Sequence, residues 1–146
     1  MRHRMVLGAL GALGVLALVL ATNVRADQPA RSFPGYWMGI DPLDGGDSRR
    51  SILQLPSGSF GLIGRDTVLT LCDNTDRGIA TFEDGVQTAR NQMASDNLNL
   101  HCFNSNAAVI LRARYTLLDA NTMIEDLTRP DGTPVTKIVF HRVSEQ

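Results

Sequence analysis

Short runs of alternating apolar and polar residues, separated by turn-forming clusters, make up the chain from about residue 35 onward. Clusters such as Pro56-Ser57-Gly58, Asp119-Ala120-Asn121 and Pro130-Asp131-Gly132 recur at intervals of roughly 8–12 residues. No stretch of this region shows a convincing apolar period of 3.6 residues. The pattern predicts an all-β fold in which antiparallel strands follow one another as a meander.

Several of the expected strands have one apolar and one polar face. The expected strands are Tyr36–Ile40, Arg50–Leu55, Ser59–Ile63, Thr67–Cys72, Gly78–Glu83, Val86–Met93, Asn97–Phe103, Ala107–Leu118, Thr122–Arg129 and Val135–Val143. In the longest of them, Leu111, Ala113 and Tyr115 alternate with polar residues. Strands with one buried face form either a closed barrel or two packed sheets. Tight turns without crossover helices favour a single antiparallel up-and-down barrel of about 8–10 strands, with a β-sandwich as the alternative.

The N-terminal residues resemble a secretory signal peptide. A basic start (Arg2, His3, Arg4) precedes an apolar run of 17 residues, Met5–Ala21, and a polar stretch that ends in Val24-Arg25-Ala26. This layout predicts cleavage between Ala26 and Asp27. An uncleaved membrane anchor is the alternative, since 17 residues is near the lower limit for a span. We therefore expect an exported protein, periplasmic or secreted, with residues 27–34 as a short extension and 35–146 as one barrel domain.

The net charge of the mature chain restricts the classes of partner that it is expected to bind. Removal of three arginines with the signal peptide leaves 14 − 3 = 11 basic against 15 acidic residues, a formal charge of −4. A mildly acidic surface argues against nucleic acid or anionic lipid as a partner, and no membrane contact is expected after cleavage. The mature length, 146 − 26 = 120 residues, excludes folds that need about 250 residues, such as a TIM barrel.

Cys72 and Cys102 are the only cysteines in the chain. In an oxidising compartment an even number of cysteines indicates disulfides, so one Cys72–Cys102 bridge is expected. The alternative is a pair of free thiols, one of them catalytic or metal-binding. That alternative is disfavoured because the two residues lack Cys-x-x-Cys spacing.

Gly35-Tyr36-Trp37 near the mature N-terminus resembles the Gly-x-Trp signature of lipocalins and the wider calycin superfamily. The resemblance implies that Trp37 closes one end of a barrel and that an arginine of the last strand, here Arg142, stacks over it. A guanidinium on an indole face is stabilised by cation–π contact and by backbone carbonyls. The chain is shorter than a typical lipocalin, so a compact lipocalin-like barrel is expected.

Candidate site residues come from the barrel interior and from one loop. The expected ligand-lining residues are Leu53, Leu69, Leu71, Phe82, Leu100, Leu111, Ala113, Tyr115 and Phe140, which can equally form a filled core. The loop after the first strand is expected at the mouth of the barrel and carries Asp41, Asp44, Asp47, Arg49 and Arg50. Its acids are expected to pair with the two arginines. Calcium binding is the alternative, although the spacing is not that of an EF-hand.

Known catalytic and phosphate-binding motifs are missing from the sequence. His101 and His141 lie in alternating segments and are expected at the surface, so we expect no catalytic residue, cofactor or metal. The first hypothesis is a binding protein that holds a small apolar ligand inside the barrel. The alternative is an inhibitor-like module that binds an exported protein through the Asp41–Ser48 loop and the Asp73–Arg77 turn. A void of a few hundred Å³ favours the first, and a packed interior favours the second.

Overall fold

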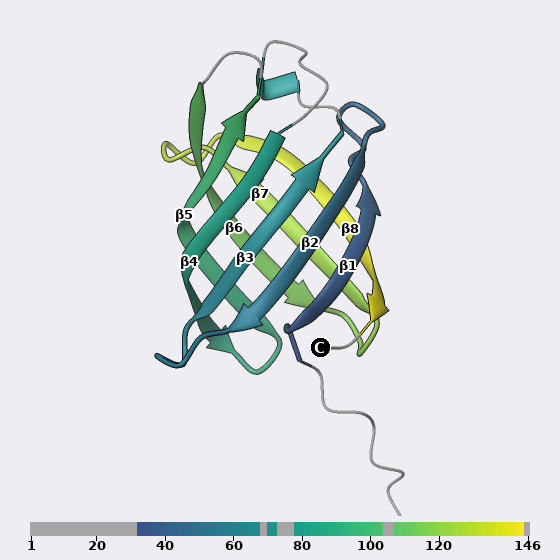
Figure 1. Ribbon diagram of the computed structural model, residues 1–146, viewed down its shortest axis with the longest axis vertical. Helices are drawn as coiled ribbons and strands as arrows, with labels where there is room; N and C mark the ends of the chain where they lie inside the picture. The colour runs from purple at the N-terminus through teal and green to yellow at the C-terminus, as the bar shows by residue number, and fades with distance from the viewer. Residues whose placement is uncertain (1–31, 68–69, 73–77, 104–106, 145–146) are drawn as a thin grey trace, which may run out of the picture.

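The chain forms a closed barrel of eight antiparallel strands in sequence order, shown in Figure 1. The computed structural model describes residues 32–67, 70–72, 78–103 and 107–144. The strands are β1 (Gly35–Ile40), β2 (Asp47–Gln54), β3 (Phe60–Asp66), β4 (Gly78–Ala89), β5 (Gln92–Cys102), β6 (Ala108–Leu117), β7 (Thr122–Thr128) and β8 (Pro134–Ser144). Pairing of β8 with β1 closes the barrel. The predicted all-β meander barrel is confirmed, and the β-sandwich alternative is wrong.

Helical structure in the described residues is limited to one 3-10 turn, η1 (Thr70–Cys72). None of the helices in that part of the chain is long and apolar enough to cross a membrane. The prediction of a strand over Thr67–Cys72 is therefore wrong at Thr67, which follows the end of β3, and at Thr70–Cys72, which form the 3-10 turn. Residues 68 and 69 lie outside the described residues.

The expected strands between Gly78 and Phe103 also differ from the structure, which has two long strands there, β4 and β5. The segment Val86–Met93 is not one strand, because the chain turns between Ala89 and Gln92. Conversely, Asp84 and Gly85, which separate the expected strands Gly78–Glu83 and Val86–Met93, lie inside the long strand β4. The carboxylate of Asp84 accepts hydrogen bonds from the Ser95 hydroxyl and, at 2.6 Å, from the Asn97 amide of β5. These hydrogen bonds between β4 and β5 hold the segment around Asp84 against β5.

Alternate residues from all eight strands point into the barrel and form one core cluster. The large, fully buried side chains are Trp37, Arg50, Ile52, Leu62, Met93, Leu98, Leu111, Tyr115, Leu117, Met123, Ile138 and Phe140. In β6 the observed alternation matches the predicted one, since Leu111, Ala113 and Tyr115 are buried while Arg112 and Arg114 are exposed. Burial of this apolar surface is the main stabilising term for the fold.

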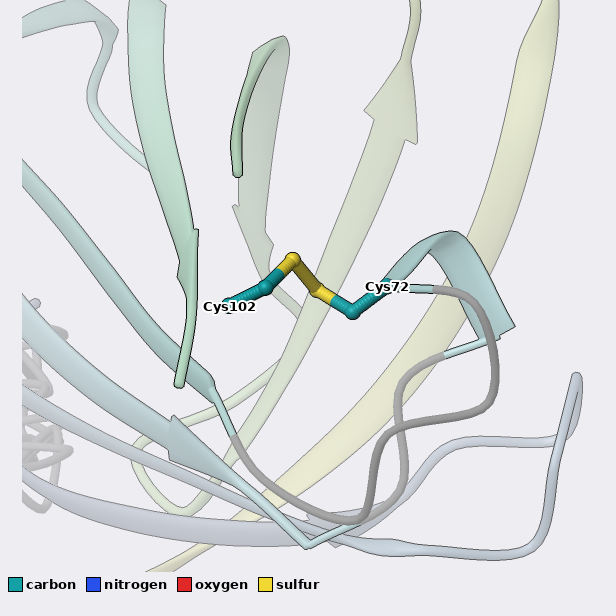
Figure 2. The surroundings of a disulfide bond; sticks show 2 residues. All are labelled: Cys72 and Cys102. Carbon is teal, nitrogen blue, oxygen red and sulfur yellow. A yellow bond between two sulfur atoms is a disulfide. The ribbon is translucent and has the colours of Figure 1, made fainter. Parts of the chain in front are cut away.

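The predicted disulfide between Cys72 and Cys102 is present, as Figure 2 shows. It joins η1 to the last residue of β5, and both cysteines are buried. We call this end of the barrel the mouth, since the loop between β1 and β2 also lies here. The opposite end, where β1 begins and β8 finishes, is called the base (Figure 1).

Candidate functional site

Trp37 and Arg142 form a stacked pair at the base. The Arg142 guanidinium carbon lies 4.1 Å from the centroid of the Trp37 ring, and Trp37 is fully buried. The indole Nε1 donates to the carbonyl of Phe33 at 2.9 Å. Arg142 donates from Nε to the carbonyl of Ala120 at 2.8 Å and from Nη1 to that of Pro34 at 2.7 Å. Carbonyl dipoles and the indole face thus stabilise the guanidinium charge, and the pair seals the base.

Gly35 leaves the space that this stack needs. A Cβ atom at position 35 would collide with the Arg142 guanidinium and would lie 3.0 Å from the carbonyl oxygen of Ser144. Gly35 also has a φ of 143°, which side chains rarely adopt. The close approach of Arg142 and Ser144 of β8 therefore explains why position 35 is a glycine.

A charged cluster fills the middle of the barrel. Arg50 is 1% exposed and donates to both carboxylate oxygens of Glu125, at 2.8 Å from Nε and 2.9 Å from Nη2. Its Nη1 donates to Asp66 at 3.0 Å. The Tyr115 hydroxyl donates to Glu125 at 2.6 Å, and the guanidinium carbon lies 5.2 Å from the centroid of the Phe140 ring. We call Arg50, Asp66, Tyr115 and Glu125 the interior network.

The interior network corrects the expected place of Arg50. We predicted Arg50 in the mouth loop, paired with loop acids, but β2 begins at Asp47 and this places Arg50 on its inward face. Gly64 lies opposite it on β3, and a Cβ at that position would be only 2.8 Å from Arg50 Cδ. The glycine therefore makes room for a long charged side chain inside the barrel.

Burial and charge act together on the titration of this network. Desolvation lowers the pKa of Arg50, but the charges of Glu125 and Asp66 outweigh it and raise the pKa well above the usual arginine value. Burial, followed by the charge of Glu125, raises the pKa of Tyr115 well above that of an exposed tyrosine. The phenol therefore stays protonated as a hydrogen-bond donor, and the guanidinium stays charged.

Glu125 and Asp66 are not among the candidate site residues expected from the sequence. Glu125 stands between Met123 and Leu127 in an alternating strand, so it occupies an inward position of β7. A charged residue at such a position signals a buried ionic partner, because an unpaired charge in a core is very costly. The hydroxyl of Ser48, also inward on β2, is buried and lacks a hydrogen-bond partner in the described part of the chain.

A small cavity lies between the interior network and the mouth. Its volume is about 20 Å³, and its walls include Asp41, Asp44, Arg50, Asp66 and Leu71. That volume is close to what one water molecule needs. The other lining residues are Leu43, Ala80, Leu98, Leu100, Leu111, Leu127, Val135, Thr136 and Ile138. The cavity is too small for an apolar ligand of a few hundred daltons.

The expected ligand-lining residues divide into three groups. Phe82, Leu100, Leu111, Ala113, Tyr115 and Phe140 are buried in the core, and Leu71 packs partly buried against it. Leu53 is 43% exposed on the outer face, because its neighbour Ile52 takes the inward position; its assignment to the interior is wrong. Leu69 lies outside the described residues.

The acids of the mouth loop bind backbone and hydroxyl groups of the chain itself. Asp41 accepts hydrogen bonds from the Thr136 hydroxyl at 2.7 Å and from the backbone N–H of Leu43 at 2.9 Å. Asp44 accepts from the N–H of Gly46 at 2.9 Å. Within the described residues, no group of three or more His, Cys, Asp or Glu side chains is placed to hold a metal ion. The loop is thus fastened to the start of β8, the neighbour of β1 in the barrel.

Asp47 and Arg49, which were expected in the mouth loop, lie in strand β2. Asp47 and Arg49 are half-buried on the outer face of β2, and Arg49 makes no side-chain ion pair with any residue that the structure describes. The expected pairing of Arg49 with the loop acids is therefore wrong, because alternation along β2 points its side chain outward, away from the lumen. The turn 73–77 lies outside the described residues.

Two hollows occupy the outer face of the wall, where the sequence had suggested no site. The hollow nearer the mouth, called the upper hollow, has a volume of about 570 Å³. It is lined by Tyr36, Arg49, Ser51, Ile63, Gly64, Arg65, Ile79 and Phe103. The hollow nearer the base, called the lower hollow, has a volume of about 410 Å³. It is lined by Leu53, Leu55, Gly61, Leu62, Ile63, Thr81, Phe82, Glu83, Asn97 and Asn99. Both include Ile63, which is 61% exposed. These residues come from β1 to β5 and the residues that directly follow β2 and β5, so the pairing of neighbouring strands brings them together.

Comparison of the chain with protein-family models, with curated proteins and with solved structures finds no match. The features that bear on its function are the filled interior, the loop held to β8 at the mouth and the two outer hollows described above.

Proposed function

We propose that this chain is an exported, non-catalytic binding protein that uses the outer surface of a compact lipocalin-like barrel to bind another protein. The contrast between interior and exterior carries the proposal. Among the described residues, the cavity found inside the barrel measures about 20 Å³, whereas the two hollows on the outer face measure about 570 and 410 Å³. Sites for small ligands are commonly about 300–1,000 Å³. Space for a partner is therefore on the outside of the barrel.

Kinship with the calycin superfamily is part of this proposal. The closed eight-strand meander and the Trp37–Arg142 stack behind Gly35 support it. The interior network separates the chain from barrels that hold an apolar ligand, since Arg50 and Glu125 occupy the middle of the lumen. The proposed kinship thus concerns the architecture and leaves the ligand open.

Export is supported by the N-terminal sequence pattern and by the disulfide. Disulfides such as Cys72–Cys102 form and persist mainly in oxidising compartments. N-terminal sequencing of the protein recovered from the exported fraction tests this point. We expect the chain to begin at Asp27, and a chain that retains Met1 in the membrane fraction would support the anchor instead.

A binding role without catalysis is supported by the placement of the histidines. His101 and His141 are both exposed, and neither has a side-chain hydrogen bond or ion pair to another residue in the described part of the chain. A general base normally needs a nucleophile or an orienting group within hydrogen-bond reach. The outer hollows are therefore better suited to recognition than to reaction.

The lumen can be tested directly with an apolar probe. Oleate is titrated into the mature, oxidised protein while methyl resonances of Leu98, Leu111 and Ile138, all inward and buried, are followed by NMR. We expect these resonances to stay unchanged. Saturable shifts of the inward methyl groups would overturn the proposal in favour of a small apolar ligand held inside the barrel.

The outer surface is tested by site-specific photocrosslinking in the exporting cell. A photoreactive residue is placed at Ile63 in the hollows or, as a control, at Leu118, which is 48% exposed in the β6–β7 turn. We expect a discrete crosslinked partner from position 63 and none from position 118. Equal crosslinking at both positions, or none at either, would contradict binding through the hollows.

A further inference from the structure

Two arginines face each other on the outer wall without acidic partners. Arg49 of β2 and Arg65 of β3 are directly paired in the sheet, and both side chains point outward. Neither guanidinium has a hydrogen bond or ion pair to another side chain within the described ranges. Like charges directly opposite one another in a sheet are destabilising. The free barrel therefore carries an unfavourable pair that a bound anion would neutralise.

Apolar side chains surround this arginine pair. Tyr36, Ile63, Ile79 and Phe103 line the same upper hollow, and Ile63 and Phe103 are 61% and 47% exposed. The upper hollow thus presents positive charge beside apolar surface. The chemistry that it complements is a carboxylate attached to, or next to, a bulky apolar group.

The lower hollow extends this surface and adds polar groups suited to a peptide backbone. It meets the upper hollow at Ile63 and contributes the exposed Leu53, the amide of Asn99 and the amide of Asn97, which also donates to Asp84. Glu83 lines this hollow too, so an acidic residue of a partner belongs at the arginine end. A side-chain amide both donates and accepts hydrogen bonds, as a peptide group does. Two adjoining hollows with amides at one end and arginines at the other fit an extended chain better than a compact small molecule.

We infer that the outer hollows bind an extended acidic segment of the partner protein, with a carboxylate between Arg49 and Arg65 and apolar side chains over Ile63 and Leu53. This inference rests on the proposed function and adds the chemistry of the partner. Bidentate hydrogen bonds from arginine suit a carboxylate, and closeness to Ile63 favours a neighbouring apolar residue. The formal charge of −4 expected for the mature chain makes this arginine pair a local exception to an acidic surface.

The test selects ligands from a displayed library of random peptides about 10 residues long, which span roughly 33 Å when extended. Selected peptides are measured against the wild type, the Arg49→Gln/Arg65→Gln double variant and an Arg90→Gln control, whose exposed arginine lies in the β4–β5 turn. We expect enrichment of Asp or Glu beside large apolar residues. We also expect binding to weaken at least about tenfold in the double variant, to stay unchanged in the control and to fall with added salt.

Several outcomes would overturn the inference. They are the selection of no binder, binders without acidic residues, or binders with equal affinity for the wild type and the double variant. Binding of dodecanoate at the hollows without any peptide binding would assign them to a small amphiphile instead. If position 63 crosslinks a protein but no acidic peptide binds, the proposed function stands and this inference fails; absence of crosslinking removes the proposed function itself.

Stability measurements separate a lost site from a lost fold. Removal of one of two facing positive charges relieves repulsion, so the urea midpoint of Arg65→Gln is expected to equal or exceed that of the wild type. A lower midpoint would show that Arg65 supports the free barrel, which would contradict a role reserved for an anionic partner.

Discussion

Glu125 accepts two hydrogen bonds from Arg50 across the lumen, at 2.8 Å from Nε and 2.9 Å from Nη2, although the two residues are 75 positions apart in the chain. They belong to β7 and β2, which are not neighbours in the sheet. The pair therefore spans the inside of the barrel and leaves no room there for a ligand. Its burial also makes it a sensitive point for stability.

Replacement of Glu125 by alanine leaves Arg50 charged and buried beside one remaining carboxylate, Asp66. We expect a loss of about 3–5 kcal/mol in the free energy of unfolding, measured by urea denaturation. Asp126→Ala is the matched control, because its ion pair with Lys137 at 2.8 Å lies on the outer face. The control is expected to lose at most about 1 kcal/mol, and similar losses in the two variants would contradict the buried network.

Tyr115 makes stability sensitive to alkaline pH. Burial and Glu125 raise its pKa in the folded state, whereas an unfolded tyrosine ionises near pH ~10. Above that pH the unfolded chain has lost a proton that the folded chain retains, so the free energy of unfolding falls as pH rises.

Tyr115→Phe removes this ionisation and should flatten the alkaline decline in urea midpoints. At neutral pH the variant should lose about 1–2 kcal/mol, because Glu125 loses the hydrogen bond from the Tyr115 hydroxyl. An alkaline decline of the same slope in wild type and variant would show that another group causes it.

Trp37→Ala should cost about 3–5 kcal/mol, because a fully buried indole at the base is replaced by a cavity. Arg142→Ala should cost less, and a double-mutant cycle should give a coupling of about 0.5–2 kcal/mol for the stack. The exposed Arg112→Ala serves as the control for loss of an arginine. A Trp37→Ala loss below about 1 kcal/mol would contradict a plug at this position.

Gly35→Ala tests the close approach of Arg142 to β1. Both the positive φ and the collision with the guanidinium oppose a side chain, so we expect a loss of about 2–4 kcal/mol. Gly58→Ala is a useful comparison, since Gly58 also has a positive φ but its added Cβ would meet nothing within 4 Å. If the two variants lose the same free energy of unfolding, the collision with Arg142 does not affect stability and the prediction is contradicted.

The Cys72–Cys102 bridge closes a loop with a sequence separation of 30 residues. On the chain-entropy estimate its removal should cost about 3–4 kcal/mol. The Cys72→Ser/Cys102→Ser variant and the reduced wild type should therefore show the same lowered urea midpoint. A clear difference between these two samples would point to an effect of the serine side chains rather than of the bridge.

The sequence by itself determined the all-β class, the buried face of the best-patterned strand and the disulfide pairing. Alternation from Leu111 to Leu117 assigns the buried face of β6, because side chains on a strand point to opposite sides with a period of two. The cysteine pair allowed only one intramolecular bridge. Both features depend on local pattern or on elimination, so they needed no knowledge of distant contacts.

Only the tertiary structure decided what fills the barrel and where a partner has room. Arg50 and Glu125 are far apart in sequence and meet because closure of the sheet brings β2 and β7 to opposite sides of one lumen. Strand pairing from β1 through β5 gathers Tyr36, Arg49 and Phe103 around one outer hollow. A local pattern states which face of a strand is buried, but the register and closure of the whole sheet determine which side chains meet across it.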